Sequence, residues 1–148
     1  MQPRLCLGTF ALILGACFQD STPQHSDFLP LDYQTQFQTV RNCRLVSEHQ
    51  NSYLKVLANA VAGDPYNATY PLPAGSVVVG EEHADPSCSS LIGYFLMAKQ
   101  SAGYYSAGGD WRWQRLDSNQ RVQQDGKLDT CASCHAKCSG SDYLCSPP

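Results

Sequence analysis

The five residues Cys131-Ala132-Ser133-Cys134-His135 constrain this chain more than any other stretch. They have the Cys-x-x-Cys-His spacing of a covalent c-type haem attachment site. Two thiols three residues apart on a helical turn can add to the two vinyl groups on one edge of a porphyrin, and the adjacent histidine then lies under the iron as its proximal ligand. The spacing therefore predicts one covalently bound haem c, attached through Cys131 and Cys134, with His135 as the axial iron ligand.

The same cysteines have other possible uses. Together with Cys138 and Cys145 they could form a four-thiolate zinc or iron–sulfur site, or two disulfides. A histidine directly after the second cysteine is expected for haem and has no role in a four-cysteine metal site. A thioredoxin-type pair would need a βαβ context near the start of a domain, whereas this pair lies near the C-terminus. Haem attachment is therefore favoured, with disulfides and thiolate metal binding as the alternatives.

The N-terminus predicts export. Residues 1–4 offer one positive charge, and residues 5–16 form an apolar run that is too short to span a bilayer. Residues 1–16 are therefore expected to be a signal peptide. The run ends in Leu-Gly-Ala-Cys, which resembles the lipobox of bacterial lipoproteins, so Cys17 is expected to carry lipid and to provide the only membrane contact. The alternative is an ordinary signal cleavage site with a chance cysteine.

Domain organisation follows from what remains. Residues 17–27 are mostly polar and are expected to form a disordered tether, and residues 28–148 are long enough for one domain with one core. Haem is attached to c-type cytochromes on the oxidising side of the bacterial inner membrane, where disulfides also form. The expected location is therefore periplasm-facing, with a lipid anchor in the inner or the outer membrane.

The eight cysteines divide without remainder in this scheme. Cys6 leaves with the signal, Cys17 carries lipid, and two cysteines carry haem, so four remain for disulfides. Of the three possible pairings we favour Cys138 with Cys145, a short local loop, and Cys43 with Cys88, a long one, because closing a long loop restricts the unfolded chain more. The chain has a formal net charge of −3 and no basic patch, so nucleic acid is not an expected partner.

The pattern of apolar residues predicts a β-rich α+β fold. Alternating or β-branched runs predict strands at residues 53–58, 76–81, 91–99 and 110–116, and a short helix leading into a further strand is expected between residues 28 and 45. Asn59 is a candidate cap for a short helix that begins at Ala60. We therefore expect an antiparallel sheet of about four to five strands, a few short helices and a C-terminal haem-binding turn.

Several short motifs occur in an order that resembles the cytochrome P-460 family, which also includes the cytochromes c′-beta. In chain order they are Arg41-Asn42-Cys43-Arg44, Asn59 before a short helix, the Pro-Ala-Gly-Ser-Val-Val-Val run at residues 73–79, Met97-Ala98-Lys99, Gly109-Asp110-Trp111-Arg112-Trp113 and the haem motif. The resemblance covers about residues 33–145. It implies an antiparallel sheet that cradles one face of the haem, an open or water-occupied sixth iron position, and a homodimer.

The resemblance also implies activities, which are hydroxylamine oxidation and the binding of nitric oxide or other small ligands. In the hydroxylamine-oxidising members a lysine near the end of the short helix is bonded to the porphyrin. The corresponding window, residues 66–70, contains no lysine, so hydroxylamine oxidation is the less favoured activity. We expect small-ligand binding or redox chemistry at a five-coordinate haem. The alternatives are an electron-transfer cytochrome with a second axial ligand, which would need a redox partner protein, and a haem-free lipoprotein binding module stapled by disulfides.

Candidates for the distal side of the haem are Tyr66, Tyr70, Phe95 and Met97, and no catalytic residue is assigned. Met97 could complete a His/Met haem, although a methionine within an apolar strand is more often core filler.

The remaining histidines and cations have simpler expected roles. For His49 we favour a structural hydrogen-bonding role over that of a distal haem ligand. His25 and His83 are expected to be solvated. Lys99, Arg112 and Arg115 are also expected to be solvated unless one of them pairs with a haem propionate.

Overall fold

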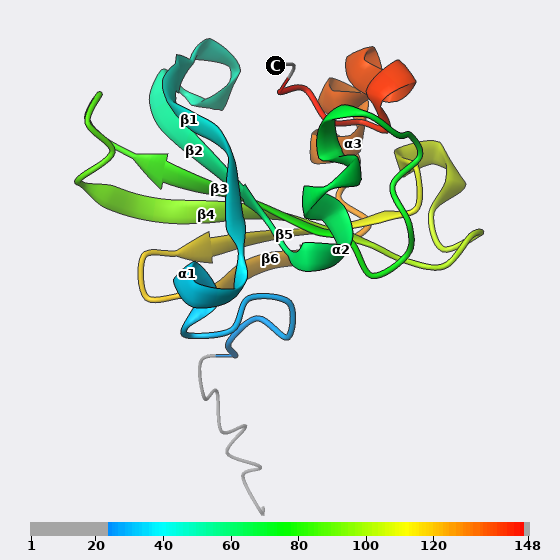
Figure 1. Ribbon diagram of the computed structural model, residues 1–148, viewed down its shortest axis with the longest axis horizontal. Helices are drawn as coiled ribbons and strands as arrows, with labels where there is room; N and C mark the ends of the chain where they lie inside the picture. Colours follow the sequence, from blue (N-terminus) through cyan, green and yellow to red (C-terminus); the bar gives the residue numbers. More distant parts are fainter. Residues whose placement is uncertain (1–23, 147–148) are drawn as a thin grey trace, which may run out of the picture.

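A computed structural model describes residues 24–146 (Figure 1). The expected signal peptide and Cys17 lie outside this range. The elements in chain order are α1 (Tyr33–Gln36), β1 (Gln38–Val46), the 3-10 turn η1 (Ser47–His49), β2 (Ser52–Ala58), α2 (Ala60–Gly63), η2 (Pro65–Asn67), β3 (Val77–His83), β4 (Leu91–Lys99), η3 (Ser106–Gly108), β5 (Trp111–Asp117), β6 (Val122–Gly126), α3 (Asp129–His135) and η4 (Ala136–Ser141).

The strands form one sheet in the order β1-β2-β3-β4-β5-β6, and every neighbouring pair is antiparallel. The predicted β-rich α+β class is therefore confirmed. The sheet has six strands, more than the four to five expected, because β6 escaped prediction. Its sequence Val-Gln-Gln-Asp-Gly holds a single apolar residue and most of the strand is exposed at a sheet edge, so no alternation of apolar residues marks it.

Both faces of the sheet carry buried side chains, because successive residues of each strand point to opposite faces. Ala58, Val78, Met97 and Trp113 stand opposite one another in register across β2 to β5 and belong to one core. Leu57, Val79 and Leu96 form the neighbouring row on the other face and belong to a second core. One sheet thus separates two hydrophobic clusters.

Short helices cover the two faces unequally. In Figure 1, α1 lies below the sheet, whereas α2 and α3 lie on the opposite side of it, together with the C-terminal segment. The buried Tyr33 of α1 belongs to the second core, and Ala62 of α2 and Ala132 of α3 belong to the first. The haem motif therefore packs over the face that carries Met97 and Trp113.

Asn59 has the capping role predicted for it. Its Oδ1 accepts hydrogen bonds from the backbone N–H of Ala62 at 3.1 Å and of Val77 at 3.0 Å. The cap satisfies a donor at the start of α2. It also ties α2 to the first residue of β3, which fixes this helix over the first core.

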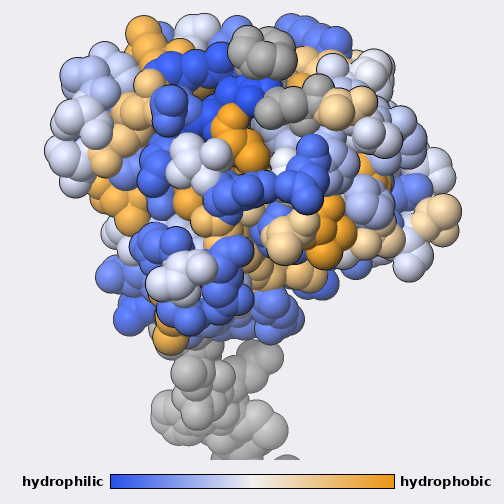
Figure 2. Space-filling view, in the orientation of Figure 1, coloured by the Kyte–Doolittle hydropathy of each residue, from blue (hydrophilic) through white to orange (hydrophobic). Residues whose placement is uncertain are grey.

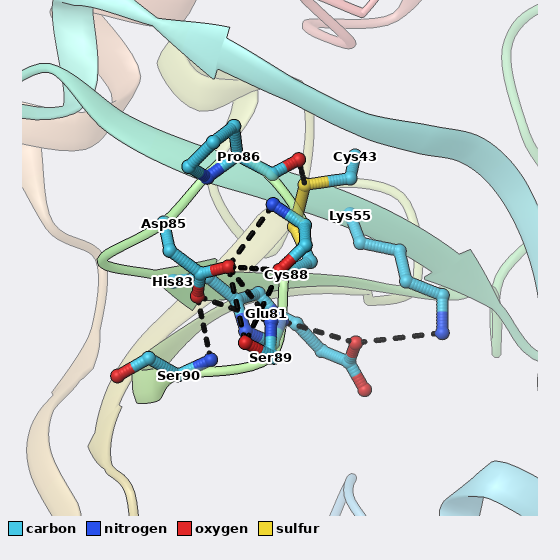
Figure 3. Close-up of a disulfide and its surroundings, with 10 residues drawn as sticks. Cys43, Lys55, Glu81, His83, Asp85, Pro86, Cys88, Ser89 and Ser90 are labelled. Atoms are coloured by element: carbon cyan, nitrogen blue, oxygen red, sulfur yellow. Dashed lines mark hydrogen bonds and ion pairs between the residues drawn. A yellow bond between two sulfur atoms is a disulfide. The ribbon is translucent and has the colours of Figure 1, made fainter.

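Two disulfides join Cys43 to Cys88 and Cys138 to Cys145, the pairs that we favoured. The first connects β1 to the loop between β3 and β4 (Figure 3). The second closes a short loop across η4. Among the described cysteines, Cys131 and Cys134 keep free thiols.

One expectation about the face of the sheet that carries the second core is wrong. His83 was expected to be solvated, but it is only 5 % exposed, and its Nε2 lies 3.5 Å from the buried carboxylate of Glu81 (Figure 3). Tyr33 donates a hydrogen bond to the same carboxylate at 2.5 Å. The β3 alternation places Glu81 and His83 on this face, which the short sequence Glu-Glu-His did not reveal.

The outer surface of the described chain is mixed in character. In the view of Figure 2, hydrophobic residues appear in small groups among hydrophilic ones. The exposed large hydrophobic residues of the range 24–146 are Leu31, Leu45, Val61, Tyr70 and Ile92. Within that range, no helix is long and apolar enough to cross a membrane.

Candidate haem site

The two free thiols lie on one short helix. Cys134 follows Cys131 by three positions on α3, so the two side chains project from the same side of it. Cys131 is half-buried and Cys134 is exposed, and both line a cavity between α3 and the sheet. Burial raises the pKa of the Cys131 thiol. Both side chains therefore reach one cavity from one direction.

His135 is oriented by a hydrogen bond from its own ring. Its Nδ1 lies 2.7 Å from the backbone carbonyl oxygen of Tyr143. A carbonyl can only accept, so Nδ1 carries the hydrogen and Nε2 is left with a free lone pair, which is the usual arrangement of a metal-ligating histidine. Trp113 packs against the ring, with 4.8 Å between ring centroids. Burial lowers the pKa of His135, so its neutral form is favoured.

The segment that supplies this carbonyl is itself anchored to the sheet. Asp142 and Tyr143 both have left-handed backbone angles, with φ of 53° and 66°. The Asp142 carboxylate accepts hydrogen bonds from Lys99 Nζ at 2.6 Å and from the Leu72 backbone N–H at 2.8 Å. Trp111 Nε1 donates to the Asp142 carbonyl at 2.8 Å. The orientation of His135 thus depends on contacts made by β4 and β5.

The cavity has a volume of about 660 Å³, within the range of sites for small molecules and cofactors. One wall is the sheet face of the first core, the other is α3 with η4 and the last described residues, and the tip of the β1–β2 hairpin closes one side. Its apolar lining includes Leu54, Val56, Val78, Phe95, Met97, Trp113 and Leu144.

Cations line the cavity along with these apolar residues. Arg44, Arg115 and Lys137 contribute to its wall. The Arg115 guanidinium lies 4.5 Å from the centre of the Phe95 ring, and its Nη2 is 3.2 Å from Glu82 Oε2. Such cations suit the carboxylates of haem propionates.

The other two predicted cations do not line the cavity. Lys99 is held in its ion pair with Asp142, and Arg112 pairs with Asp125 beyond the cavity. Lys99 was expected to be solvated, but its side chain is only 10 % exposed. Of the three candidates for a propionate contact, Arg115 is the one that the structure places at the cavity.

Three of the four predicted distal residues reach the cavity. Tyr66, Phe95 and Met97 line it. Tyr70 is corrected: it is 38 % exposed, it is not part of the lining, and its hydroxyl donates a hydrogen bond to the Tyr66 carbonyl at 2.6 Å. The turn that follows η2 points this side chain back along the chain, and sequence spacing alone does not predict such a turn.

His49 also lines the cavity, close to His135 of the haem motif. The centroids of the His49 and His135 rings are 6.3 Å apart and their planes are inclined by 83°. Phe95 packs against His49 at 4.5 Å. Burial lowers the pKa of His49, and the electrostatic influence of the neighbouring His135 and Arg115 acts in the same direction. The sequence offered this residue only as the less favoured distal candidate.

The lysines have distinct positions. Lys55 faces the second core, where its Nζ lies 3.6 Å from Glu81. Lys99 is engaged with Asp142. Among the described lysines, Lys137 on η4 lines the cavity. Sequence reasoning missed Lys137, although its place two residues after the haem motif was a signal that could have found it.

The thiolate alternative does not match the structure. Because Cys138 and Cys145 are joined to each other, they are not available as thiolate ligands beside Cys131 and Cys134. Across residues 24–146, no group of three or more histidine, cysteine or acidic side chains is placed to hold a metal ion. The chemistry of the cavity is therefore that of two thiols, an oriented imidazole and an apolar wall with cations.

Comparison with known proteins identifies the group to which this arrangement belongs. The model of the cytochrome P-460 family matches residues 30–146. The chain belongs to the cytochrome P-460 family. A comparison with curated proteins gave no match. Membership of the cytochrome P-460 family supports a cytochrome that binds haem, and the family match spans almost the whole of the described sheet and cavity.

The residues of the cavity fit the haem of a cytochrome P-460 protein. Cys131 and Cys134 are free while the other four described cysteines are paired. His135 Nε2 is left available by the hydrogen bond at Nδ1. Apolar strand residues can cover the porphyrin, and Arg44, Arg115 and Lys137 can receive its propionates.

Proposed function

We propose that this protein is a lipid-anchored, periplasm-facing monohaem c-type cytochrome that performs small-ligand or redox chemistry. Cys131 and Cys134 attach the haem and His135 is the proximal ligand. One observation carries the proposal. His135 lies on the same helix as the two free thiols, and its Nδ1 donates a hydrogen bond to the Tyr143 carbonyl. This bond fixes the tautomer that a proximal ligand needs.

When bound, haem supplies an iron that changes oxidation state by one electron and binds diatomic ligands such as nitric oxide. The chain's own residues supply the environment. The hydrogen bond from Nδ1 to the Tyr143 carbonyl makes His135 more electron-donating, and the apolar wall around Val56, Val78 and Met97 keeps water away. Both effects tune a redox potential, so the cavity suits either nitric oxide binding or electron transfer with a partner protein.

The test of haem attachment uses the full chain, expressed with and without c-type maturation machinery. We expect haem to remain with the protein through acid-acetone extraction, and to be lost from it in the double variant Cys131→Ala plus Cys134→Ala. Ser133→Ala is the matched control, because it lies between the two cysteines, is exposed, and leaves both thiols intact. A colourless, stable protein after maturation would favour a haem-free, disulfide-stapled binding module.

The anchor and the assembly are part of the same proposal. Cys17 is the proposed lipidation site, and labelling with a radioactive fatty acid should mark the wild-type protein and not Cys17→Ser. A homodimer is proposed from the family resemblance, and light scattering of the soluble domain measures it. Hydroxylamine oxidation is not part of the proposal, because residues 66–70 hold no lysine.

A further inference from the structure

His49 lies close to His135 at the cavity that fits the haem. It ends η1 at the tip of the β1–β2 hairpin, which stands at the top of Figure 1 as α3 does. The two imidazoles line the same cavity from different elements. Their ring centroids are 6.3 Å apart.

This separation matches that of two histidines sharing one metal ion. Imidazole nitrogens lie about 2 Å from a bound metal, so two rings on opposite sides of it have centres about 6 Å apart. The angle of 83° between the two imidazole planes does not hinder such sharing, because each nitrogen lone pair points along its own ring.

The ring of His49 forms no hydrogen bond within residues 24–146. The ring packs against Phe95 and lies near the ring of His135. Glu48 and Arg115 act on it electrostatically. No hydrogen bond from the described chain reaches either ring nitrogen, so the structural hydrogen-bonding role that we favoured from the sequence is not seen. A half-buried imidazole without a protein partner, facing a cavity, is available as a ligand.

The hairpin tip is built in a way that fixes this residue. Gln50 and Asn51, which follow His49, both have left-handed backbone angles, with φ of 58° and 59°. Positive φ at two consecutive residues is the geometry of a tight β-hairpin turn, and asparagine adopts it more readily than most residues. The hydroxyl of the buried Ser52 donates a hydrogen bond to the His49 carbonyl at 2.6 Å. The turn and this bond together hold the His49 backbone next to the cavity.

Met97 is the competing candidate, and its environment fits another role. It is 7 % exposed in the middle of the sheet, it stands between Val78 and Trp113 in the cross-strand row, and it belongs to the first core. A side chain packed into that row fills the wall of the cavity. His49, in contrast, lies on a turn outside the sheet.

We propose that His49 is the second axial ligand of the haem iron. The inference rests on the proposed haem attachment, and it replaces the five-coordinate iron expected from the sequence with a six-coordinate, bis-histidine haem. An external ligand such as nitric oxide then binds only after His49 has left the iron. The resting protein is suited to one-electron transfer, because its coordination need not change with oxidation state.

The experiment uses the holo-protein after haem maturation. The ferric wild-type protein should be low-spin, and its near-infrared charge-transfer band should be that of two imidazoles and not of an imidazole with a thioether. This measurement needs no variant and therefore does not depend on the folding of one. His49→Ala should be high-spin, and added imidazole should restore the low-spin spectrum. His25→Ala, at an exposed histidine, is the matched control and should keep the wild-type spectrum. Met97→Leu should stay low-spin, because leucine has no thioether to bind iron.

Ligand kinetics give an independent measurement. Carbon monoxide binding to the ferrous wild-type protein should reach a rate that no longer rises with ligand concentration, because dissociation of His49 limits it. In His49→Ala the binding rate should rise in proportion to the carbon monoxide concentration. At high concentration it should exceed the wild-type rate at least tenfold. A high-spin wild-type protein overturns the inference and leaves haem attachment intact. So does a His49→Ala protein that stays low-spin and becomes high-spin only when Met97→Leu is added to it. Absence of attached haem overturns the proposed function instead.

Discussion

Lys99 Nζ lies 2.6 Å from Asp142 Oδ1, and the side chains of both residues are at least nine-tenths buried. The pair joins β4 to the C-terminal segment. The residue after Asp142 is Tyr143, whose carbonyl oxygen receives the hydrogen bond from His135. Lys99 also donates to the Gly109 carbonyl at 2.7 Å and lies 4.9 Å from the centre of the Trp111 ring. This ion pair therefore supports the orientation of His135.

Lys99→Met should destabilise the protein strongly. The methionine fills much of the same volume but leaves the Asp142 carboxylate buried without its cation, which costs about 3–5 kcal/mol of the free energy of unfolding. Urea denaturation of the holo-protein measures this loss. Lys127→Met is the control, because Lys127 is exposed, and its effect should stay within about 0.5 kcal/mol.

A double variant separates the buried charge from the lost packing. Asp142→Asn added to Lys99→Met removes the unpaired charge and keeps an acceptor for the Leu72 N–H. The two substitutions should therefore be clearly non-additive, with the double variant more stable than the sum of the single losses predicts. Simple additivity would show that the pair contributes no coupling energy.

The two disulfides should differ in their contributions to stability. Cys43 and Cys88 are 45 residues apart and Cys138 and Cys145 are 7 apart. The loop-closure model gives about 4 kcal/mol for the first bond and about 2.5 kcal/mol for the second. Replacing both cysteines of each pair by serine, so that no odd thiol remains, should reproduce this order in urea denaturation.

Their effects on the haem spectrum should follow the reverse order. The Cys138–Cys145 bond brackets Tyr143, which orients His135. The Cys43–Cys88 bond joins β1 to the β3–β4 loop, away from the haem motif. The weaker bond should therefore change the absorption spectrum of the holo-protein when removed, and the stronger one should not. An altered spectrum in Cys43→Ser plus Cys88→Ser alone would contradict this assignment.

Sequence predicted those parts of the fold that depend on neighbouring residues. The run from Ser76 to Glu81 is β-branched and became β3, and Asn59 precedes a helix that it caps. The thiols of Cys131 and Cys134 and the imidazole of His135 were chosen as candidate haem residues from spacing alone, and the structure places all three at one cavity. Short-range patterns carry this information because backbone preference and side-chain alternation are local properties.

The remaining features depend on contacts between distant residues. The Lys99–Asp142 pair spans 43 positions, and His49 meets His135 across 86. The edge strand β6 is polar and gives no periodic signal. His83 is buried where it stands in register with Tyr53 of β2 and Leu91 of β4. None of these relationships leaves a local trace in the sequence, so they required the structure.

Gly109→Ala should be more damaging than Gly75→Ala. Both glycines have positive φ, at 65° and 89°, so an alanine is strained by about 1 kcal/mol at either site. A Cβ at Gly109 would also lie 2.5 Å from the Tyr143 ring, whereas a Cβ at Gly75 meets nothing within 4 Å. The extra loss at Gly109 should be about 1–3 kcal/mol by urea denaturation. Equal losses would mean that the Tyr143 ring moves aside freely.

Asp85 organises the loop between β3 and β4 that carries Cys88 (Figure 3). Its carboxylate accepts hydrogen bonds from the Ser87 hydroxyl and from the backbone N–H of Ser90 at 2.7 Å and of Ser89 at 3.1 Å. These bonds, the Ser87 hydroxyl first among them, lower the pKa of Asp85 to about 2. The charged carboxylate therefore holds the loop in shape.

The acid dependence of stability should reflect this carboxylate. The pKa of an aspartate in the unfolded chain is about 3.9, so the unfolded state binds the proton more readily than the folded state does. The contribution of Asp85 is therefore complete above about pH 4 and is lost as the pH falls toward 2. A carboxyl-detected NMR titration should place the pKa of Asp85 near 2. In Asp85→Asn the slope of stability against pH in this interval should be smaller, and an unchanged slope would show that other carboxylates account for all of it.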